Sequence, residues 1–342
     1  MSDLLATLVS GQAADDPGPW SELWDRVRRR EAGQGELAGV VAVLSARPLD
    51  PGTARALVAS LSGEPVSPPG TDAVNIVGTG GGPRTFNIST AAALVAAAAG
   101  VRVIKTGSRA YTSRHGSFDL LERLGVRLTR SPAETADLLG RHGIAFAGPY
   151  VYPEALRRLA TALLPLDIRR IGRVFNLLGP LLASVPVAAR LVGVADRSLV
   201  PVLRAAADPG THGRVWLCHN EPGVDELLAF TTNTIDTGGE RPRPPSAGTG
   251  GRLGLPLPDP PVLGGGDLAD LTPVGDDADL TAHFVGLLDG SAPRPAVDTV
   301  ALNAAALVLA AGRADGWPTA LEAARGAIVT GRAAALLKEL RS

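Results

Sequence analysis

A glycine-rich turn directly follows a short apolar run, and this pairing limits the possible folds more than any other feature of the chain. Val74–Val77 has the pattern of a buried strand, and the turn Gly78–Pro83 follows it without a break. Apolar spacing then predicts a helix over 89–99, a strand over 101–104 and a helix over 117–124. Strands that alternate with helices form a parallel sheet with helices on its faces. We therefore predict an α/β fold with a mainly parallel central sheet.

The chain is longer than one hydrophobic core usually organises, because it has 342 residues. Residues 20–62 have the apolar spacing of two or three short helices, and the proline-rich stretch 65–70 reads as a hinge. We expect a small N-terminal all-helical domain over 1–70 and an α/β domain over 71–342.

The second half of the chain predicts fewer strands and more helices. Strands are expected over 189–194 and 214–219, and Leu227–Phe230 is an apolar, β-prone run. Residues 237–263 are rich in glycine and proline and read as an irregular loop. Helical spacing returns over three stretches, which are 279–289, 298–312 and 318–340.

The composition excludes several classes of protein. The formal net charge of −1 argues against a general nucleic-acid-binding surface. Cys218 is the only cysteine, which excludes an intrachain disulfide and a thiolate metal site and favours a reducing compartment, so we expect a cytoplasmic protein. The alanine-rich stretch 91–100 is too short to span a membrane.

Three neighbouring segments have the composition of a phosphate site. Residues without side chains in Gly78–Gly82 let backbone N–H groups approach an anion. Asn87–Thr90 opens a helix, where free N–H groups and the helix dipole favour phosphate, although the same side chains also serve as ordinary helix caps. Lys105 ends the second strand and is one of only two lysines. Ligands of open α/β sheets bind at this edge.

Motifs in several separated places resemble the anthranilate phosphoribosyltransferase family. They are Val77–Gly81, Phe86–Thr90 and Lys105-x-Gly107-x-Arg109, then Phe175–Leu181, Gly223–Glu226 and Leu302–Ala305. The resemblance covers nearly the whole chain. It implies a Mg²⁺-assisted transfer of 5-phosphoribosyl from phosphoribosyl pyrophosphate (PRPP) to a small acceptor. It also implies a homodimer and a helical domain completed by a mid-chain segment near 153–186.

The resemblance assigns roles to individual residues. It places pyrophosphate at Gly78–Gly81 and the 112–117 loop, the ribose 5-phosphate at Asn87, Ser89, Thr90 and Lys105, and magnesium at Ser89, Asp225 and Glu226. The full set of PRPP-binding candidates is Gly78, Thr79, Gly80, Gly81, Asn87, Ser89, Thr90, Lys105, Gly107, Arg109, Thr112, Ser113, Gly116 and Ser117. No covalent nucleophile is needed, and His115 is a candidate general base.

The chain departs from the family's pattern on the acceptor side. Thr106 and Ser108 stand where the family usually has His and Asn, and Gly82 stands where it has Asp. Ungapped counting back from Asn176 puts Leu166 at the position of the family's anthranilate-binding arginine, although Arg169, Arg170 or Arg173 could substitute from a shifted register.

These departures predict an acceptor other than anthranilate. A carboxylate acceptor favours a bidentate arginine and a cationic one favours acids. The family includes members that O-ribosylate aminoglycosides, so the resemblance implies a hydroxyl of an aminoglycoside or another specialised metabolite as the acceptor, and a role in antibiotic biosynthesis. The candidate acceptor-binding residues are Ser108, Tyr152, Asp167 and Arg170. The alternatives are an anthranilate phosphoribosyltransferase of tryptophan biosynthesis, a nucleoside phosphorylase, and a non-catalytic nucleic-acid-binding member.

Overall fold

The computed structural model describes residues 3–62, 72–107, 116–239, 259–272 and 277–341, without the side chains of 169–170, 209–210 and 277–278. The chain divides into two compact units. One unit contains Met1–Pro68, Tyr150–Pro186 and Ser198–His212, and the other contains Pro69–Pro149, Val187–Arg197 and Gly213–Ser342. The predicted boundary between residues 70 and 71 lies outside the described residues, and the domain limits stay predictions.

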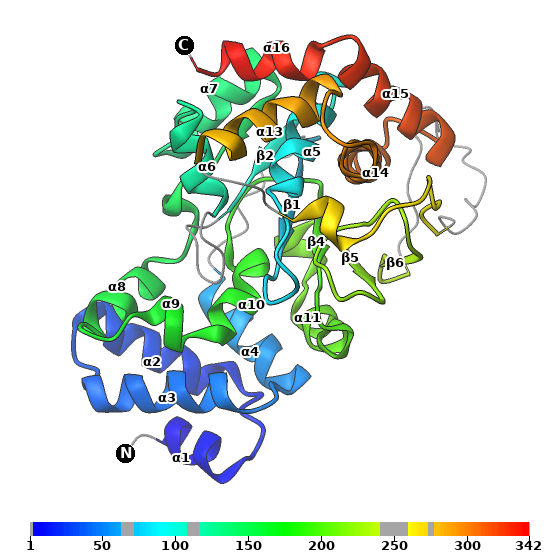
Figure 1. Cartoon of the computed structure of the whole chain (residues 1–342). Coiled ribbons are helices and arrows are strands. Elements are labelled where there is room, and N and C mark those ends of the chain that lie inside the picture. The colour runs from blue at the N-terminus through cyan, green and yellow to red at the C-terminus, as the bar shows by residue number, and fades with distance from the viewer. Residues whose placement is uncertain (1–2, 63–71, 108–115, 240–258, 273–276, 342) are drawn as a thin grey trace, which may run out of the picture. The chain divides into compact units, whose positions relative to one another are not determined.

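A six-stranded sheet forms the centre of the second unit (Figure 1). Its strands are β1 (Val74–Gly78), β2 (Val103–Lys105), β3 (Ile144–Phe146), β4 (Ala189–Gly193), β5 (Arg214–Asn220) and β6 (Asn233–Asp236), in the order β3-β2-β1-β4-β5-β6. All neighbours are parallel except β6, which pairs antiparallel with β5. The predicted α/β class with a mainly parallel sheet is confirmed.

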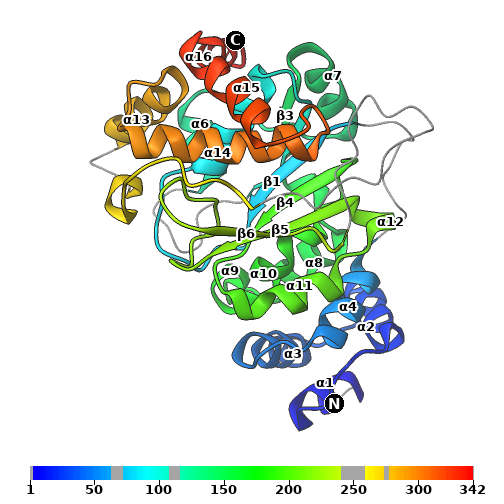
Figure 2. The same ribbon diagram turned by 90° about the vertical axis from the view of Figure 1, so that its right-hand side faces the viewer.

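Alanine-rich helices pack closely on this sheet. Helix α5 (Ile88–Ala98) and helix α14 (Arg294–Ala310) contact each other and the central strands, and Figure 2 shows α14 lying across one side of the sheet. Buried alanines at the contact let the two helices approach closely. The other helical elements of the unit are α6 (Ser117–Arg123), α7 (Pro132–His142), η3 (Leu268–Leu271), α13 (Asp277–Asp289), α15 (Trp317–Val329) and α16 (Arg332–Glu339).

Two helices of the first unit, α2 (Pro17–Arg29) and α4 (Pro51–Leu61), begin with a side-chain cap and a proline. The Asp16 carboxylate accepts a hydrogen bond from Gly18 N, and that of Asp50 accepts one from Thr53 N. In each case a proline occupies the first helical position, where its missing N–H costs nothing. The N-terminal helices are α1 (Asp3–Ser10), α2 (Pro17–Arg29), α3 (Gln34–Ala46) and α4 (Pro51–Leu61).

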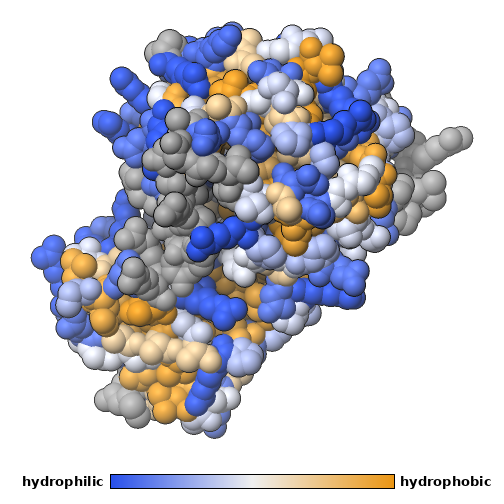
Figure 3. All heavy atoms as spheres, viewed as in Figure 1, coloured by the Kyte–Doolittle hydropathy of each residue, from blue (hydrophilic) through white to orange (hydrophobic). Residues whose placement is uncertain are grey.

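A mid-chain segment completes this unit, and Figure 1 shows α8 and α9 in green beside the blue N-terminal helices. Its elements are η1 (Pro149–Val151), α8 (Glu154–Ala162), α9 (Ile168–Ile171), α10 (Arg173–Leu182), η2 (Arg197–Leu199), α11 (Val200–Ala206) and α12 (Pro209–His212). The surface of the unit is partly apolar, as orange spheres in Figure 3 show, and Val9, Leu164 and Leu166 are exposed.

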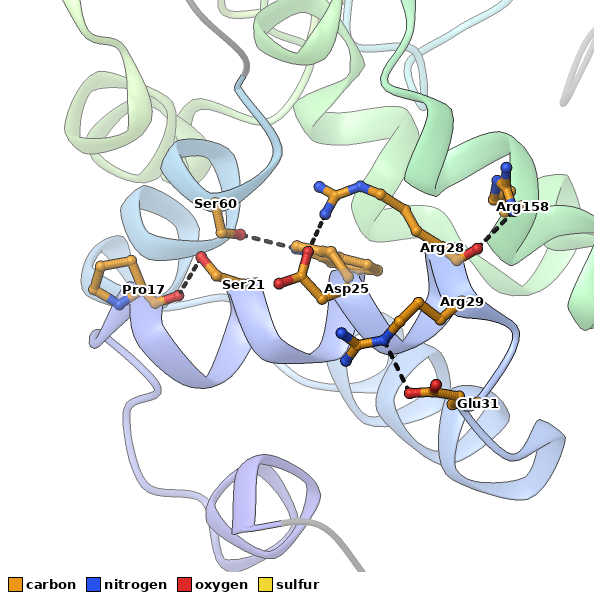
Figure 4. Close-up of polar contacts among 9 residues, drawn as sticks. Pro17, Ser21, Asp25, Arg28, Arg29, Glu31, Ser60 and Arg158 are labelled. Atoms are coloured by element: carbon orange, nitrogen blue, oxygen red, sulfur yellow. Dashed lines mark hydrogen bonds and ion pairs between the residues drawn. The ribbon is translucent and has the colours of Figure 1, made fainter.

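Polar contacts join the helices of the first unit (Figure 4). The indole of Trp24 donates to Ser60 Oγ at 2.9 Å, and Arg158 on α8 donates to the backbone carbonyl of Arg28 on α2 at 2.6 Å. Trp20 stacks on Trp24 with 6.3 Å between ring centroids, and both rings are fully buried. The two tryptophans therefore belong to the unit's core.

Several expected elements differ in the structure. Leu227–Phe230 is not a strand, and the helix expected over 318–340 is two helices separated at Gly331, whose φ is +71°. Strands β3 and β6 and helix α1 were not expected from the sequence pattern. Much of the loop expected over 237–263 lies outside the described residues. No helix in the described ranges has both the length and the apolar character needed to cross a membrane.

Candidate active site

The candidate site lies where two neighbouring parallel strands end. Gly78 ends β1, Gly193 ends β4, and the two glycines pair with each other in the sheet. The order in which strands are added to the sheet reverses at this place, since β2 and β3 lie on one side of β1 while β4 and β5 lie on the other. Open α/β sheets bind ligands in the crevice at such a switch point.

Asp225 packs directly against this pair of glycines. A Cβ at Gly78 would overlap Asp225 Oδ2, and a Cβ at Gly193 would overlap the backbone carbonyl of Asp225. Only glycine therefore lets the segment that carries Asp225 approach the ends of both strands.

Hydrogen bonds join the glycine turn Gly78–Pro83, and Thr85 just after it, to the acidic segment, which is the segment Val224–Ala229 that carries Asp225 and Glu226. Gly80 N donates to Asp225 Oδ2 at 2.8 Å, and Thr85 Oγ1 donates to Glu226 Oε2 at 3.2 Å. Gly80 and Gly81 have φ values of +69° and +91°, which glycine adopts without strain. A Cβ at Gly82 would overlap the carbonyl of Gly223, so a side chain in place of this glycine would separate the two segments. Gly82, which stands in place of the family's aspartate, thus packs closely against the backbone at Gly223.

Lys105 is buried at the end of β2. Its ammonium donates to the carbonyls of Ile76 and Thr106 at 2.9 and 3.0 Å. Burial lowers the pKa of Lys105 to about 8, although the charges of Glu226 and Asp225 act to raise it. The ammonium can make three hydrogen bonds, so two of its protons are used by these carbonyls.

Burial raises the pKa of both acidic side chains. For Asp225 the hydrogen bond from Gly80 and the charge of Lys105 act against burial, and for Glu226 the neighbouring Asp225 charge adds to it. Burial destabilises the charged forms of these two neighbouring carboxylates, and a bound cation would stabilise them. Mg²⁺ uses one or two carboxylates together with water and substrate phosphates. In the described part of the chain no group of three His, Cys, Asp or Glu residues converges, so a metal here would depend on such additional oxygens.

The start of helix α5 carries polar groups that do not cap the helix. Asn87 is the N-cap residue, yet its side chain makes no capping hydrogen bond. Thr90 is fully buried, and its Oγ1 has no hydrogen-bond partner in the described structure. Ser89, between them, is partly exposed. An unpartnered buried hydroxyl costs free energy, which a bound phosphate oxygen could recover.

The second predicted phosphate segment is described only at its two ends. A Cβ at Gly107 would overlap Ser117 Oγ, so this glycine allows the end of β2 to meet the start of α6. Gly116 N donates to Asp119 Oδ2 at 2.9 Å. Ser108, Arg109, Thr112, Ser113 and the candidate base His115 lie outside the described residues.

The predicted acceptor-binding residues belong to different parts of the chain. Tyr152 and Asp167 lie in the helical unit and are partly exposed, and the side chain of Arg170 lies outside the described residues. Thr106, which stands at the family's histidine position, is buried and paired with Asn75 through two hydrogen bonds. The hydroxyl of Thr106 therefore accepts a hydrogen bond from a side chain of β1.

Neither the contact between Thr85 and Glu226 nor a role for Asn303 was predicted from the sequence. One feature of the sequence pointed to Asn303, which is a polar residue within a long apolar helix. Its partner Leu227 is distant in the sequence, so the spacing does not predict the contact.

Comparisons with known proteins identify the family of the chain. The family described as "Glycosyl transferase family, a/b domain" matches residues 70–334. "Anthranilate phosphoribosyltransferase 2" of Ralstonia nicotianae is 33% identical over 347 residues, which cover 99% of this chain and 96% of the relative. A protein of the same name from Streptomyces coelicolor is 38% identical over 275 residues, covering 80% and 78%.

Solved structures have the same fold. The anthranilate phosphoribosyltransferase of Thermus thermophilus matches with a TM-score of 0.78 and 30% identity over 99% of this chain and 98% of that one. The Saccharomyces cerevisiae enzyme in complex with PRPP and Mg matches with a TM-score of 0.75 at 21% identity, over 98% and 95%. The chain therefore belongs to the anthranilate phosphoribosyltransferase family of glycosyl transferases and is a phosphoribosyltransferase.

Proposed function

We propose that this enzyme transfers the 5-phosphoribosyl group of PRPP to anthranilate and releases pyrophosphate. The observation that carries the proposal is the near full-length match to a relative that bears this name, at 33% identity over 99% of the chain. The sequence departures favoured another acceptor, but these relatives support the anthranilate alternative better. The net charge of −1 speaks against the nucleic-acid-binding alternative.

The residues at the sheet edge suit the PRPP half of this reaction. The backbone N–H groups of the glycine turn and of the start of α5 can hold phosphate oxygens, and the ammonium of Lys105 supplies positive charge beside them. Asp225 and Glu226, with the hydroxyl of Ser89, would hold Mg²⁺, which would stabilise the charge that develops on the leaving pyrophosphate. Positioning of the acceptor beside the ribose supplies much of the remaining acceleration.

A hydroxyl of a cationic amino sugar is a second candidate for the acceptor. The observation that favours it is Leu166, which is 42% exposed and precedes Asp167. Ungapped counting back from Asn176 puts Leu166 at the position of the family's arginine. An acid beside an apolar side chain suits an ammonium group better than a carboxylate.

A panel of acceptors separates the two candidates. The protein is incubated with PRPP and Mg²⁺ plus either anthranilate or one of several aminoglycosides, and pyrophosphate release is followed. We expect saturable release with anthranilate. Release with an aminoglycoside alone would assign the second candidate, and no release with any acceptor would contradict transfer itself.

The resemblance to the family also suggests a homodimer formed through the helical unit. The exposure of Leu164 at 63% and of Leu166 at 42% supports this assembly, since exposed apolar side chains favour association. The cytoplasmic location stays a prediction.

A further inference from the structure

The segment Val224–Ala229, which carries Asp225 and Glu226, has neither helical nor strand hydrogen bonding. Val224 and Leu227–Ala229 are nevertheless fully buried. Buried backbone N–H and C=O groups need partners, because an unpaired one costs about as much as a lost hydrogen bond. In this segment most of the partners are side chains, and Ala229 O accepts a hydrogen bond from the backbone N–H of Leu263 at 2.7 Å.

Asn220, at the end of β5, holds the first half of the segment. Its Oδ1 accepts a hydrogen bond from Val224 N at 3.1 Å. Its Nδ2 donates to the carbonyls of Val224 at 3.1 Å and Glu226 at 2.7 Å. One side chain thus binds the backbone on both sides of Asp225.

Asn303, in the middle of α14, holds the next residue. Its Oδ1 accepts from Leu227 N at 3.1 Å, and its Nδ2 donates to Leu227 O at 2.7 Å. The same Nδ2 lies 2.9 Å from Thr299 O on its own helix, which fixes the orientation of the amide. Asn303 is 1% exposed, so these bonds are shielded from water.

Two further side chains continue the series. Asn233, at the start of β6, binds Leu228 N at 2.7 Å and Leu228 O at 2.8 Å. Thr299 Oγ1 accepts from Ala229 N at 3.3 Å. The side chains that fix the segment therefore come from β5, β6 and α14, which are rigid parts of the unit.

We propose that Asn220 and Asn303 are positioning residues for Mg²⁺-dependent binding of PRPP. They grip the backbone immediately before Asp225 and immediately after Glu226, and so fix the direction in which the two carboxylates leave the chain. This inference rests on the proposed function of Asp225 and Glu226 as the metal-binding pair. Residues that orient ligands of a metal in this way typically contribute 10- to 100-fold to its affinity, as an order of magnitude.

The test compares PRPP binding with and without Mg²⁺ by isothermal titration calorimetry, with no acceptor present. The measured quantity is the ratio of the two dissociation constants for each protein. A residue that only stabilises the fold would leave this ratio unchanged in the folded fraction, whereas a positioning residue changes it.

The variants are Asn303→Leu and Asn220→Ala, so that the test survives if one of them fails to fold. The matched control is Thr135→Val, which removes a buried hydrogen bond to Thr129 Oγ1 beside β3, the edge strand of the same sheet. Thermal unfolding of each protein identifies those that are folded at the temperature of the titration.

We expect Mg²⁺ to tighten PRPP binding in the wild type and in Thr135→Val to the same degree. In Asn303→Leu and Asn220→Ala the tightening falls about tenfold or more, while the dissociation constant without Mg²⁺ stays close to that of the wild type. Unchanged tightening in a folded variant would overturn the positioning role and leave the proposed function intact. A wild type that does not bind PRPP would overturn both.

Discussion

Lys105 combines a positive charge with nearly complete burial. The residue is 3% exposed, and its ammonium donates hydrogen bonds to two backbone carbonyls. Burial lowers the pKa of Lys105 to about 8. The ammonium form is therefore maintained near pH 7 but loses its proton about 2.5 pH units below the usual pKa of 10.5. This places its titration within the range of an ordinary pH profile.

We predict that PRPP affinity falls as pH rises above about 8. Loss of the Lys105 proton removes the charge that attracts phosphate, and the fall approaches tenfold per pH unit for a single ionisation, as an order of magnitude. Dissociation constants measured from pH 7 to 9.5 check this. Lys105→Met should bind PRPP weakly with little dependence on pH in that window, and an identical profile in both proteins would contradict the assignment.

The lowered pKa of Lys105 also makes the free energy of unfolding depend on pH. The folded pKa of Lys105 is lower than the unfolded one, so the unfolded chain holds more protons between about 8 and 10.5. The contribution of this group to the free energy of unfolding therefore rises with pH across that window. It is at its least below pH 8, where the buried lysine is charged.

Single residues differed in how far the sequence alone could identify them. The placement of Gly78 and Lys105 at strand ends was predictable from the apolar runs that precede them, and their binding roles stay predictions. The contacts of Thr85 and Asn303 were not predictable, because their partners are residues 141 and 76 positions away. Spacing in the sequence carries no signal of such pairs.

At the scale of elements, the acidic segment shows where pattern reasoning failed. Leu227–Phe230 has the composition of a strand, but its buried backbone bonds to the side chains of Asn303, Asn233 and Thr299 instead of a neighbouring strand. Hydrophobicity predicted the burial of the segment correctly and its hydrogen bonding wrongly. Helices and strands with clear periodicity, such as α5 and β1, were predictable because their partners are local or repeat along the chain.

Gly193→Ala tests the close contact between β4 and the acidic segment. The added Cβ would overlap the carbonyl of Asp225, so the segment must move. We expect a loss of about 1–3 kcal/mol in the free energy of unfolding and weaker PRPP binding in the presence of Mg²⁺. Urea denaturation and calorimetry measure the two effects.

Gly140→Ala is the matched control for this substitution. Gly140 lies within α7 of the same unit, and a Cβ there meets nothing within 4 Å. Alanine in a helix interior should stabilise the protein by about 0.5–1 kcal/mol and leave PRPP binding unchanged. If Gly193→Ala behaves like Gly140→Ala, the contact is not required.

At the scale of the whole molecule, motifs spread along the chain identified the family, because blocks from β1, α10, the acidic segment and α14 all match it. The acceptor was harder to predict. Its candidate residues Tyr152 and Asp167 belong to one compact unit and the PRPP candidates to the other, so no local pattern links them.

The proposed homodimer predicts that exposed apolar residues of the helical unit control assembly. We expect the wild type to have the mass of a dimer in light scattering after size exclusion. The pair Leu164→Ser and Leu166→Ser should shift it toward monomer. Val329→Ser, which alters an 83% exposed valine of the other unit, should have no effect. A monomeric wild type would contradict the proposal.

The most direct test of the account is pyrophosphate release from PRPP with anthranilate and Mg²⁺, measured for the wild type and for Asp225→Asn combined with Glu226→Gln. These substitutions keep size and remove charge at the sheet edge. We predict Mg²⁺-dependent release by the wild type and a rate at least about 100-fold lower in the variant, since metal stabilisation of a leaving group is worth several kcal/mol. Equal rates in the two proteins would contradict the central claim that this edge of the sheet is the site of phosphoribosyl transfer.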